Sequence, residues 1–394
     1  MITKRGNKRT IMNKNDADLL PYEARFPNKA KASQSSIERK ERQRGGEDKG
    51  NWPTRTWVIS DGTAGMLAQG IALVKAMEIP AEDIRALPTP LLRAFPRLAN
   101  LPGWQLTLGR KPDWLRANQW PDLCITCGRR MAGISIGVRR LAMGKTKTIH
   151  IQDPHIDPLY FDLMITPRHD NIAQKAANGQ LDIPNLLTTT GALNRLDKAE
   201  IAEEAAVLKA THEEGEADGR PLALVMVGGH NRRYKPRADA FNKLANELAA
   251  FGQMTRARLA LVPSRRTPNR GLQLLARQLE DQLGAEALWI WDEASHNPYP
   301  GLLGLADFVI VTSDSVNMTS EAALTGKPVL TAELAAEEGR IARFHQMMQD
   351  AGHTARLKDV LTRPELLKET FTVLDERAEI SAAVYEFFEG VRPQ

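Results

Sequence analysis

The feature that most constrains this chain is a strand–turn–helix unit in residues 297–329. Residues 306–312 form a short apolar run rich in β-branched side chains, which is typical of a strand buried on both faces of a parallel sheet. Polar residues 313–315 follow this run, and a helix then begins, with Glu321 in its first turn. The unpaired N–H groups and the positive dipole end of such a helix attract anions. The unit therefore predicts an α/β fold with an anion site where the strand ends.

Several side chains of this unit are candidates for binding a ligand. Ser313, Asp314 and Ser315 place hydroxyl and carboxylate groups at the strand end. Glu321 lies where a carboxylate could hold a sugar hydroxyl, although it could instead complete a capping box. Together these groups suit a nucleotide diphosphate beside a ribose.

Length and composition favour a two-domain globular protein. A chain of 394 residues is too long for one ordinary core, and 42% hydrophobic residues with mixed charges are typical of soluble proteins. No apolar run approaches the roughly 20 residues that cross a bilayer, and the N-terminus carries no secretory signal. We therefore expect a cytoplasmic protein, either free or peripheral at the inner face of the membrane.

The two cysteines, Cys124 and Cys127, form a CxxC pattern that redox and metal sites also use. They lie in an apolar run that leads into a turn, and the chain has no second pair to complete a zinc site. We expect core cysteines, which suit a reducing cytosol.

The net charge of +5 originates in the first 50 residues, which carry 13 Lys and Arg against 7 Asp and Glu. The remaining 344 residues sum to −1, so we expect no nucleic-acid partner for the body of the protein. Residues 1–52 have little periodic apolar content and are predicted to form a disordered basic tail. A nucleic-acid arm or a transit peptide is open for this tail, and a solvated leader is the simplest interpretation.

Two α/β halves follow one another, and each opens with a strand, a glycine turn and a helix. These elements are residues 56–60, 61–65 and 66–77 in the first half, and residues 222–227, 228–229 and 238–251 in the second. Further strands alternate with helices, which predicts parallel sheets. We predict two Rossmann-like domains, residues 53–210 and 211–370, that face each other across a cleft. Residues 371–394 are predicted to form a C-terminal helix that packs back on the first domain.

The second half offers two more phosphate-binding elements at strand ends. Gly228 and Gly229 would let the backbone approach a ligand closely, although a tight turn explains them equally well. Ser264, Arg265 and Arg266 follow the next strand, and their two guanidinium groups suit phosphate oxygens unless they form a solvated loop. The recurrence of such elements at successive strand ends favours a nucleotide site.

The first half offers acid–base candidates. They are Asp61 in a glycine loop with Gly62 and Gly65, a cluster of Asp153, His155 and Asp157, and the pair His169-Asp170 at the end of the next strand. A carboxylate beside an imidazole is what a general base needs, and the same side chains could ligate a divalent metal ion. The sequence shows no fixed metal-ligand spacing such as HxxxH, and Asp-Pro or His-Asp pairs at strand ends, such as His169-Asp170, are also common turn and cap chemistry.

Residues 86–108 combine apolar side chains with arginines and form a separate candidate surface. Leu91, Leu92, Phe95, Leu98, Leu101 and Trp104 alternate with or are flanked by Arg85, Arg93, Arg97 and Arg110. Such a segment could dock on an anionic membrane surface. Ordinary packing under a proline-rich loop is the competing interpretation.

These motifs resemble the mitochondrial fission protein family, which is named for a plant factor and is widespread in bacteria. The resemblance covers roughly residues 55–390 and rests on short motifs: residues 60–65 with Gln69, 152–155, 167–170, 190–192, 227–229, 264–268, 297–299, 312–316 with Glu321, and 325–328. One position departs from the family pattern, where Asn317 stands in place of an expected serine.

The family in turn resembles GT-B glycosyltransferases, whose C-terminal domain binds the sugar nucleotide and whose helix-borne glutamate holds the ribose. The resemblance implies that Glu321 is this glutamate and that Ser315, Met318 and Thr319 lie near the diphosphate. Asn297 belongs to one of the shared motifs. The loop from Asp61 to Gly65 would then face the acceptor.

The resulting hypothesis is a GT-B-type glycosyltransferase that moves a nucleotide-activated sugar to a lipid or glycan acceptor of the cell envelope. Asp61 or His155, with Asp157 in the same cluster as His155, would supply the base. We expect no metal and no cofactor beyond the nucleotide-sugar donor, because cationic side chains and helix dipoles can stabilise the leaving diphosphate. Two alternatives stay open: a non-enzymatic, membrane-associated adaptor with a protein partner, and a nucleotide-sugar epimerase.

Overall fold

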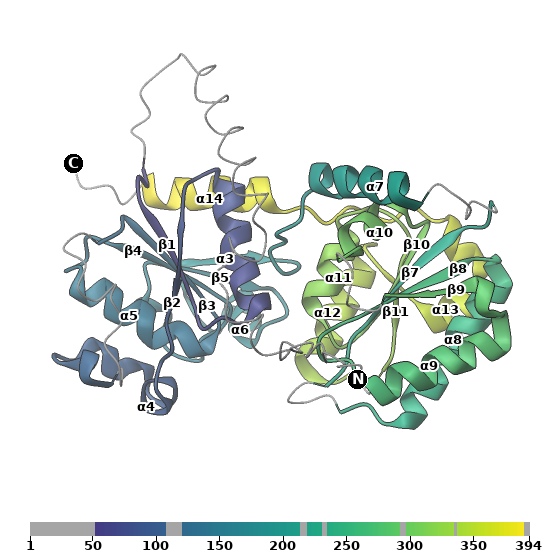
Figure 1. Cartoon of the computed structure of the whole chain (residues 1–394). Helices are drawn as coiled ribbons and strands as arrows, with labels where there is room; N and C mark the ends of the chain where they lie inside the picture. Colours follow the sequence, from purple (N-terminus) through teal and green to yellow (C-terminus); the bar gives the residue numbers. More distant parts are fainter. Residues whose placement is uncertain are drawn as a thin grey trace, which may run out of the picture. The chain divides into compact units, whose positions relative to one another are not determined.

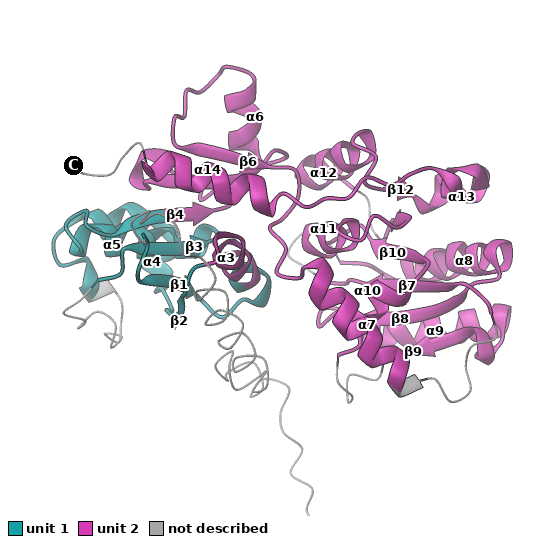
Figure 2. Cartoon of the chain, turned by 90° about the horizontal axis from the view of Figure 1, so that it is seen from above, with its two compact units in different colours: residues 1–67, 79–148 teal, residues 68–78, 149–394 magenta. Residues whose placement is uncertain are grey.

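The computed structural model describes residues 52–107, 120–212, 219–230, 235–291, 297–334 and 337–389 (Figure 1). Nearly all of the predicted basic tail, and Arg110 of the predicted membrane segment, lie outside these ranges. The chain divides into two compact units, residues 1–67 with 79–148 and residues 68–78 with 149–394 (Figure 2). The predicted domain boundaries at residues 53, 211 and 371 divide the chain differently and stay predictions.

The first sheet has six strands in the order β2-β1-β3-β4-β5-β6, and the pairings described for it are parallel. Its strands are β1 (Thr56–Ser60), β2 (Glu82–Arg85), β3 (Leu123–Cys127), β4 (Lys147–Ile151), β5 (Leu163–Pro167) and β6 (Leu186–Thr189). The α-helices of this part are α3 (Ala64–Met77), α4 (Pro90–Ala94), α5 (Ala132–Leu141) and α6 (Asn171–Ala177). Every residue of β1 and β3 is buried, which agrees with their apolar, β-branched sequences.

The second sheet also has six parallel strands, in the order β12-β11-β10-β7-β8-β9. Its strands are β7 (Leu222–Val227), β8 (Arg258–Pro263), β9 (Leu288–Ile290), β10 (Phe308–Thr312), β11 (Val329–Ala332) and β12 (Ala355–Arg356). The later helices are α7 (Lys198–His212), α8 (Ala238–Thr255), α9 (Asn269–Leu283), α10 (Tyr299–Leu305), α11 (Val316–Ala323), α12 (Gly339–Asp350), α13 (Leu357–Thr362) and α14 (Arg377–Glu389). The predicted α/β class with two parallel sheets is therefore confirmed.

Successive residues of β7 feed two different cores, because side chains alternate along a strand. Val225 and Val227 pack in one cluster with α8 and α9, whereas Leu224 and Met226 pack in another with α10. Figure 1 shows α8 and α9 on one side of this sheet and α11 and α12 on the other. Both faces are covered, which explains why the strands are continuously apolar.

The predicted core cysteines are free and buried in β3. Burial raises the pKa of the Cys124 thiol far above its ordinary value, so this thiol stays protonated and unreactive. The Cys127 Sγ atom lies 3.5 Å from the Met66 sulfur. The burial of Cys124 and the sulfur contact of Cys127 are both typical of core cysteines.

The segment of residues 86–107 is anchored on α5 by two glycines. A Cβ at Gly133 would press on Leu92, and one at Gly137 would collide with the Trp104 ring. Leu92 and Trp104 are correspondingly buried, whereas the large apolar residues between and beside them, Leu87, Leu91, Phe95 and Leu101, are 50–67% exposed. Packing therefore accounts for part of the predicted membrane segment and leaves these four side chains largely exposed. Within the described ranges, no helix is long and apolar enough to cross a lipid bilayer.

Gly137→Ala tests the close approach of Trp104 to α5. The added methyl group collides with the ring, so we expect a net loss of about 1–2 kcal/mol in stability even though alanine favours a helix. Urea denaturation followed by circular dichroism measures this loss. Adding Trp104→Phe should recover part of it, because the smaller ring frees space. A fully additive loss in the double variant would contradict the packing described here.

Candidate functional site

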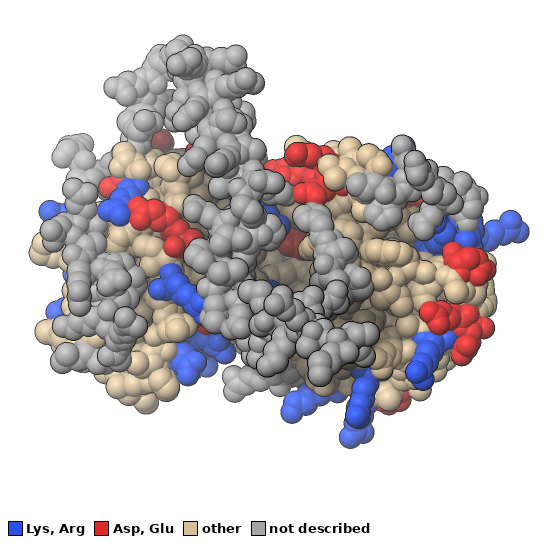
Figure 3. Space-filling model, viewed as in Figure 1, with Lys and Arg blue, Asp and Glu red and all other residues tan. Residues whose placement is uncertain are grey.

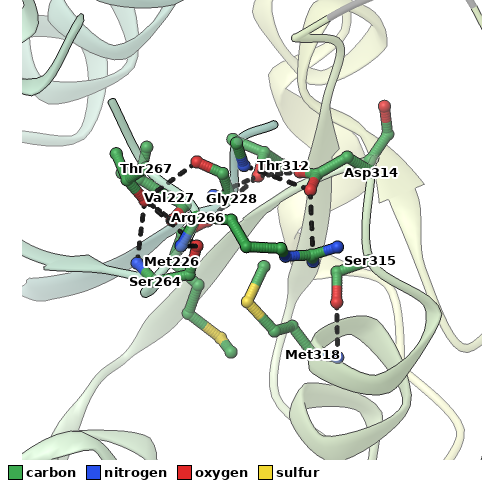
Figure 4. Close-up of polar contacts among 12 residues, drawn as sticks. Met226, Val227, Gly228, Ser264, Arg266, Thr267, Thr312, Asp314, Ser315 and Met318 are labelled. Atoms are coloured by element: carbon green, nitrogen blue, oxygen red, sulfur yellow. Dashed lines mark hydrogen bonds and ion pairs between the residues drawn. The ribbon is translucent and has the colours of Figure 1, made fainter. Parts of the chain in front are cut away.

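The carboxyl ends of three adjacent strands carry the predicted nucleotide-binding residues of the second half. The sheet order places β7 between β10 and β8. Gly228 and Gly229 follow β7, residues 264–266 follow β8, and residues 313–315 follow β10. Parallel strands end at the same edge, so the fold brings these elements together. Figure 4 shows residues from all three strand ends around the Asp314 carboxylate.

The Asp314 carboxylate is buried and joins the three strand ends. Its Oδ1 atom accepts a hydrogen bond from the Thr312 hydroxyl at 2.7 Å, and its Oδ2 atom accepts one from the Gly229 N–H at 3.2 Å. An Nη atom of Arg266 approaches Oδ2 to 3.5 Å. Burial raises the pKa of Asp314, while the Thr312 hydroxyl, the Gly229 N–H and Arg266 act to lower it. Asp314 is therefore an internal anion of the site.

The two glycines after β7 are required by this arrangement before any ligand binds. A Cβ at Gly228 would collide with the Asp314 carboxylate, and one at Gly229 would collide with the Arg266 carbonyl. The Gly228 N–H also donates to the Thr312 hydroxyl at 2.7 Å. Contacts within the protein therefore explain both glycines, and their predicted close approach to a ligand stays a prediction.

The turn after β8 is held by Thr267. Its hydroxyl oxygen lies 2.6 Å from the Val227 carbonyl oxygen and accepts the Ser264 N–H at 2.9 Å. The Ser264 hydroxyl accepts the Arg266 N–H at 3.3 Å. These contacts aim the Arg266 side chain at Asp314, as Figure 4 shows, and leave Arg265 exposed. Both predicted arginines are exposed, and Arg266, with 43% of its side chain exposed, is the one held against Asp314.

The start of α11 combines a helix N-terminus with buried hydroxyls. Ser315 is the N-cap, and its hydroxyl accepts the Met318 N–H at 3.4 Å. The Ser313 hydroxyl is buried and has no hydrogen-bond partner among the described residues. The Thr319 hydroxyl is also buried, but it donates to the Ser315 carbonyl at 3.1 Å. Ser313 is therefore the better hydroxyl candidate for an anion, and Thr319 serves its own helix.

α11 begins at Val316 and has no acidic residue in its first turn, so the predicted first-turn position of Glu321 is wrong and Glu321 does not complete a capping box with Ser315. Glu321 is instead bound by Tyr299, which lies in a shared motif but had no predicted role. The Tyr299 hydroxyl, at the start of α10, donates to Glu321 Oε2 at 2.7 Å. Burial raises the pKa of Glu321, while the Tyr299 hydroxyl and Arg195 act to lower it. Asn297, another predicted site residue, is exposed, and its Oδ1 atom accepts the Tyr299 N–H at 3.1 Å.

The loop after β6 lies against α11 beside this glutamate. The Ala192 N–H donates to the Ser320 hydroxyl at 3.0 Å, and the Asn194 side chain donates to the Ser320 carbonyl at 2.9 Å. A Cβ at Gly191 would lie 2.6 Å from the Ser320 hydroxyl. This packing explains why the 190–192 motif contains a glycine.

Asp61 lies in the loop after β1 and forms an ion pair with Arg130. Their carboxylate and guanidinium are 3.1 Å apart, and Asp61 also accepts the Thr63 N–H at 3.0 Å. Burial acts to raise the pKa of Asp61, but the Thr63 hydrogen bonds and Arg130 hold it below its ordinary value. Asp61 is therefore a weaker base than the sequence suggests. Gly62 has φ of +84°, a conformation that favours glycine, and Gly65 lies in the first turn of α3.

His155 and Asp153 form an exposed imidazole–carboxylate pair. His155 Nδ1 lies 3.1 Å from the Asp153 carboxylate, and 59% of the imidazole side chain is exposed. Gln152 and His155 both have positive φ, at 72° and 58°, which is uncommon outside glycine and often marks functional loops. Asp157 instead caps the turn that follows, since it accepts the Leu159 N–H at 3.0 Å. The pair has the geometry of a general base.

The neighbouring His169 and Asp170 belong to the interior. Burial lowers the pKa of His169 to about 4, and its ring stands edge-on to Phe344 with centroids 5.0 Å apart. The Asp170 carboxylate is bound by Arg340 at 2.9 Å. This arrangement gives both residues a structural role.

Metal ligands and surface charge are the remaining features of the described ranges. No group of three or more His, Cys, Asp or Glu side chains there is arranged to hold a metal ion. Figure 3 shows basic and acidic side chains interspersed over α8 and α9, without a continuous positive block. That face does not resemble a nucleic-acid surface.

Three contact residues of the site, Thr312, Thr267 and Tyr299, lie within the shared motifs, but the sequence predicted no role for them. Thr312 and Asp314 are two residues apart, so strand periodicity could have shown that they share a face. Thr267 and Tyr299 act on partners 40 and 22 residues away, and no local pattern reports such contacts.

Comparison with known proteins identifies a family. The family model described as Mitochondrial fission ELM1 matches residues 64–388 of this chain. The mitochondrial fission protein ELM1 of Arabidopsis thaliana is 31% identical over 251 residues, which are 59% of this chain and 56% of that protein. The uncharacterised protein RP120 of Rickettsia prowazekii is 25% identical over 310 residues, 69% of this chain and 81% of that protein. The chain thus spans just over half the length of the plant relative.

Solved structures with a similar fold include UDP-GlcNAc 2-epimerases. The enzyme of Methanocaldococcus jannaschii has a TM-score of 0.55 at 12% identity and covers 85% of this chain and 99% of its own. The enzyme of Neisseria meningitidis, bound to UDP-GlcNAc, has a TM-score of 0.51 at 13% identity with the same coverage. At these identities the likeness shows the fold.

Asp314→Asn tests the internal anion through the pH dependence of stability. A carboxyl pKa raised in the folded protein means that the folded state binds the extra proton, so the wild type loses stability as pH rises from 3.8 through the raised value. The asparagine variant lacks this proton. We therefore expect the stability of the wild type relative to the variant to increase on acidification from pH 8 to about 4. Urea midpoints at each pH measure the difference, and a pH-independent difference would contradict the buried carboxylate.

Proposed function

The chain belongs to the mitochondrial fission ELM1 family, and from its site we propose that it binds a nucleotide-activated sugar and transfers the sugar to an acceptor. The observation that carries this proposal is the convergence of three strand ends of the second sheet on the Asp314 carboxylate. That edge offers the α11 N-terminus, the buried Ser313 hydroxyl and the exposed Arg265. A diphosphate fits this set of donors.

In this proposal the second half of the chain holds the donor nucleotide. Glu321 accepts a ribose hydroxyl, and the α11 N-terminus with Arg265 and Arg266 stabilises the diphosphate as it leaves. No metal is needed for that step, because the positive charge comes from the chain itself. Nucleotide sugars are the ligands named for the UDP-GlcNAc epimerase structures of the same fold, which supports this choice of substrate class.

We propose His155 as the general base, with Asp153 orienting its imidazole. The imidazole is exposed and paired with a carboxylate, whereas Asp61 is neutralised by Arg130 and Asp157 caps a turn. A lipid or glycan of the cell envelope is the acceptor class that we propose.

An epimerase and a non-enzymatic adaptor are the two other candidate functions. A nucleotide-sugar epimerase would keep the donor site and need no acceptor, and the fold shared with UDP-GlcNAc 2-epimerases favours it as the second candidate. A non-enzymatic adaptor would use the fold to recruit a protein partner at a membrane, and the name of the plant relative favours this reading.

We also propose a peripheral membrane contact, and hence a location at the inner face of the membrane, through the segment of residues 86–107. Leu87, Leu91, Phe95 and Leu101 are exposed there while Leu92 and Trp104 anchor the segment. Arg93 and Arg97 are also exposed, and the segment contains no acidic residue. Exposed apolar side chains among arginines suit a surface of anionic lipids.

Glu321→Ala tests the donor site. Thermal unfolding of the protein is measured with UDP, GDP, ADP and CMP and their sugar conjugates. A ligand at about 100 times its dissociation constant should add roughly 2.7 kcal/mol of stability. We expect one nucleotide class to stabilise the wild type, and the variant to lose most of that effect. The control Glu280→Ala removes an exposed carboxylate from α9 and should respond as the wild type does. Absence of any response in the folded wild type would favour the adaptor.

Leu91→Gln with Phe95→Gln tests the membrane contact. The two substitutions remove apolar area that would enter the lipid, so binding to phosphatidylglycerol vesicles should fall about tenfold or more. Co-sedimentation measures the bound fraction, and Leu181→Gln, another exposed leucine, is the control. Equal binding by wild type and variant would refute this surface.

A further inference from the structure

Tyr299, the first residue of α10, is held in place by contacts at both ends of this helix. Asn297 accepts the Tyr299 N–H at 3.1 Å, which sets the first helical residue. The other end of α10 is held by Lys327, whose Nζ donates to the carbonyls of Leu303 at 2.9 Å and Gly304 at 2.6 Å. Lys327 follows α11 in the chain, so α10 and α11 are tied at this end.

The second tie between these helices is the hydrogen bond from Tyr299 to Glu321. The phenol donates to Oε2 at 2.7 Å, whereas Oε1 has no hydrogen bond from the described residues. Glu321 keeps partial solvent exposure. One carboxylate oxygen is thus held by the protein and the other is available to a ligand hydroxyl.

We propose that Tyr299 is a positioning residue that holds Glu321 for the ribose of the donor nucleotide and thereby selects ribonucleotides over dideoxyribonucleotides. This inference rests on the proposed function. A carboxylate that is already oriented loses little side-chain freedom when it accepts a ribose hydroxyl. Without the phenol it can rotate, and the preference for a ribose declines.

Protonation offers a second consequence of the same contact. The groups that face Glu321 are Tyr299 of α10 and Arg195 of the loop before α7, and both act to lower the pKa that burial raises. Removing the phenol therefore raises the pKa of Glu321 further. A protonated carboxyl is a poorer acceptor, so the preference for a ribose should disappear at a higher pH in Tyr299→Phe than in the wild type.

Calorimetric titration of the full chain with UDP, ADP, GDP and CDP, and with the 2′,3′-dideoxy analogue of each, tests this assignment. For the nucleotide that binds, we expect the wild type to prefer the ribonucleotide about tenfold or more, since hydrogen bonds to a charged group are strong. Tyr299→Phe should reduce the preference to about threefold or less, and Glu321→Gln should abolish it. Affinity for the dideoxy analogue should stay nearly constant.

Tyr385→Phe is the matched control, because it also removes a phenol that hydrogen-bonds within the protein, to the Met77 carbonyl at 2.9 Å. It should keep the wild-type preference. An unchanged preference and pH profile in Tyr299→Phe would overturn the assignment and leave the donor site intact, as would a wild type that binds both analogues equally. A folded wild type that binds none of the four nucleotides would overturn the proposed function together with this inference.

Discussion

The site depends on the contacts that one buried carboxylate, that of Asp314, makes with three strand ends. This carboxylate accepts hydrogen bonds from Thr312 at the end of β10 and from Gly229 after β7, and it receives Arg266 from the turn after β8. Three adjacent strand ends are thereby fixed to one another. The cost is a desolvated charge, which these partners offset only in part, since the pKa of Asp314 remains raised. A buried carboxyl whose pKa stays raised is typical of functional sites.

A second set of contacts surrounds α11 and sets its orientation. The loop after β6 holds Ser320, and Tyr299 holds Glu321. Lys327, which follows α11 in the chain, is hydrogen-bonded to α10. A helix fixed on these sides presents its N-terminus in one direction, which is what a preorganised anion site requires. The glycines near it, Gly191 and Gly228, are explained by close packing against Ser320 and Asp314.

Much of this architecture follows from local sequence patterns. Apolar β-branched runs predicted β1 and β7 at their observed bounds, and the polar residues after β8 and β10 lie at the same sheet edge as Gly228 and Gly229, as expected. The edge strand β2 escaped prediction because Glu82–Arg85 has no apolar pattern and exists by pairing with β1. The pairing of Gly229 with Asp314, 85 residues apart, and of Tyr299 with Glu321, 22 residues apart, also could not be predicted from local patterns. Such contacts are set by tertiary packing.

A nucleoside diphosphate is proposed to bind where β7, β8 and β10 end. Hydrogen–deuterium exchange of the intact protein, with and without saturating UDP, ADP, GDP or CDP, tests this binding most directly, because backbone N–H groups that hold a phosphate become protected. We expect protection in peptides covering Gly228–Gly229 and the first turn of α11 with at least one of the nucleotides. Protection confined to other segments, or none with any nucleotide, would contradict it.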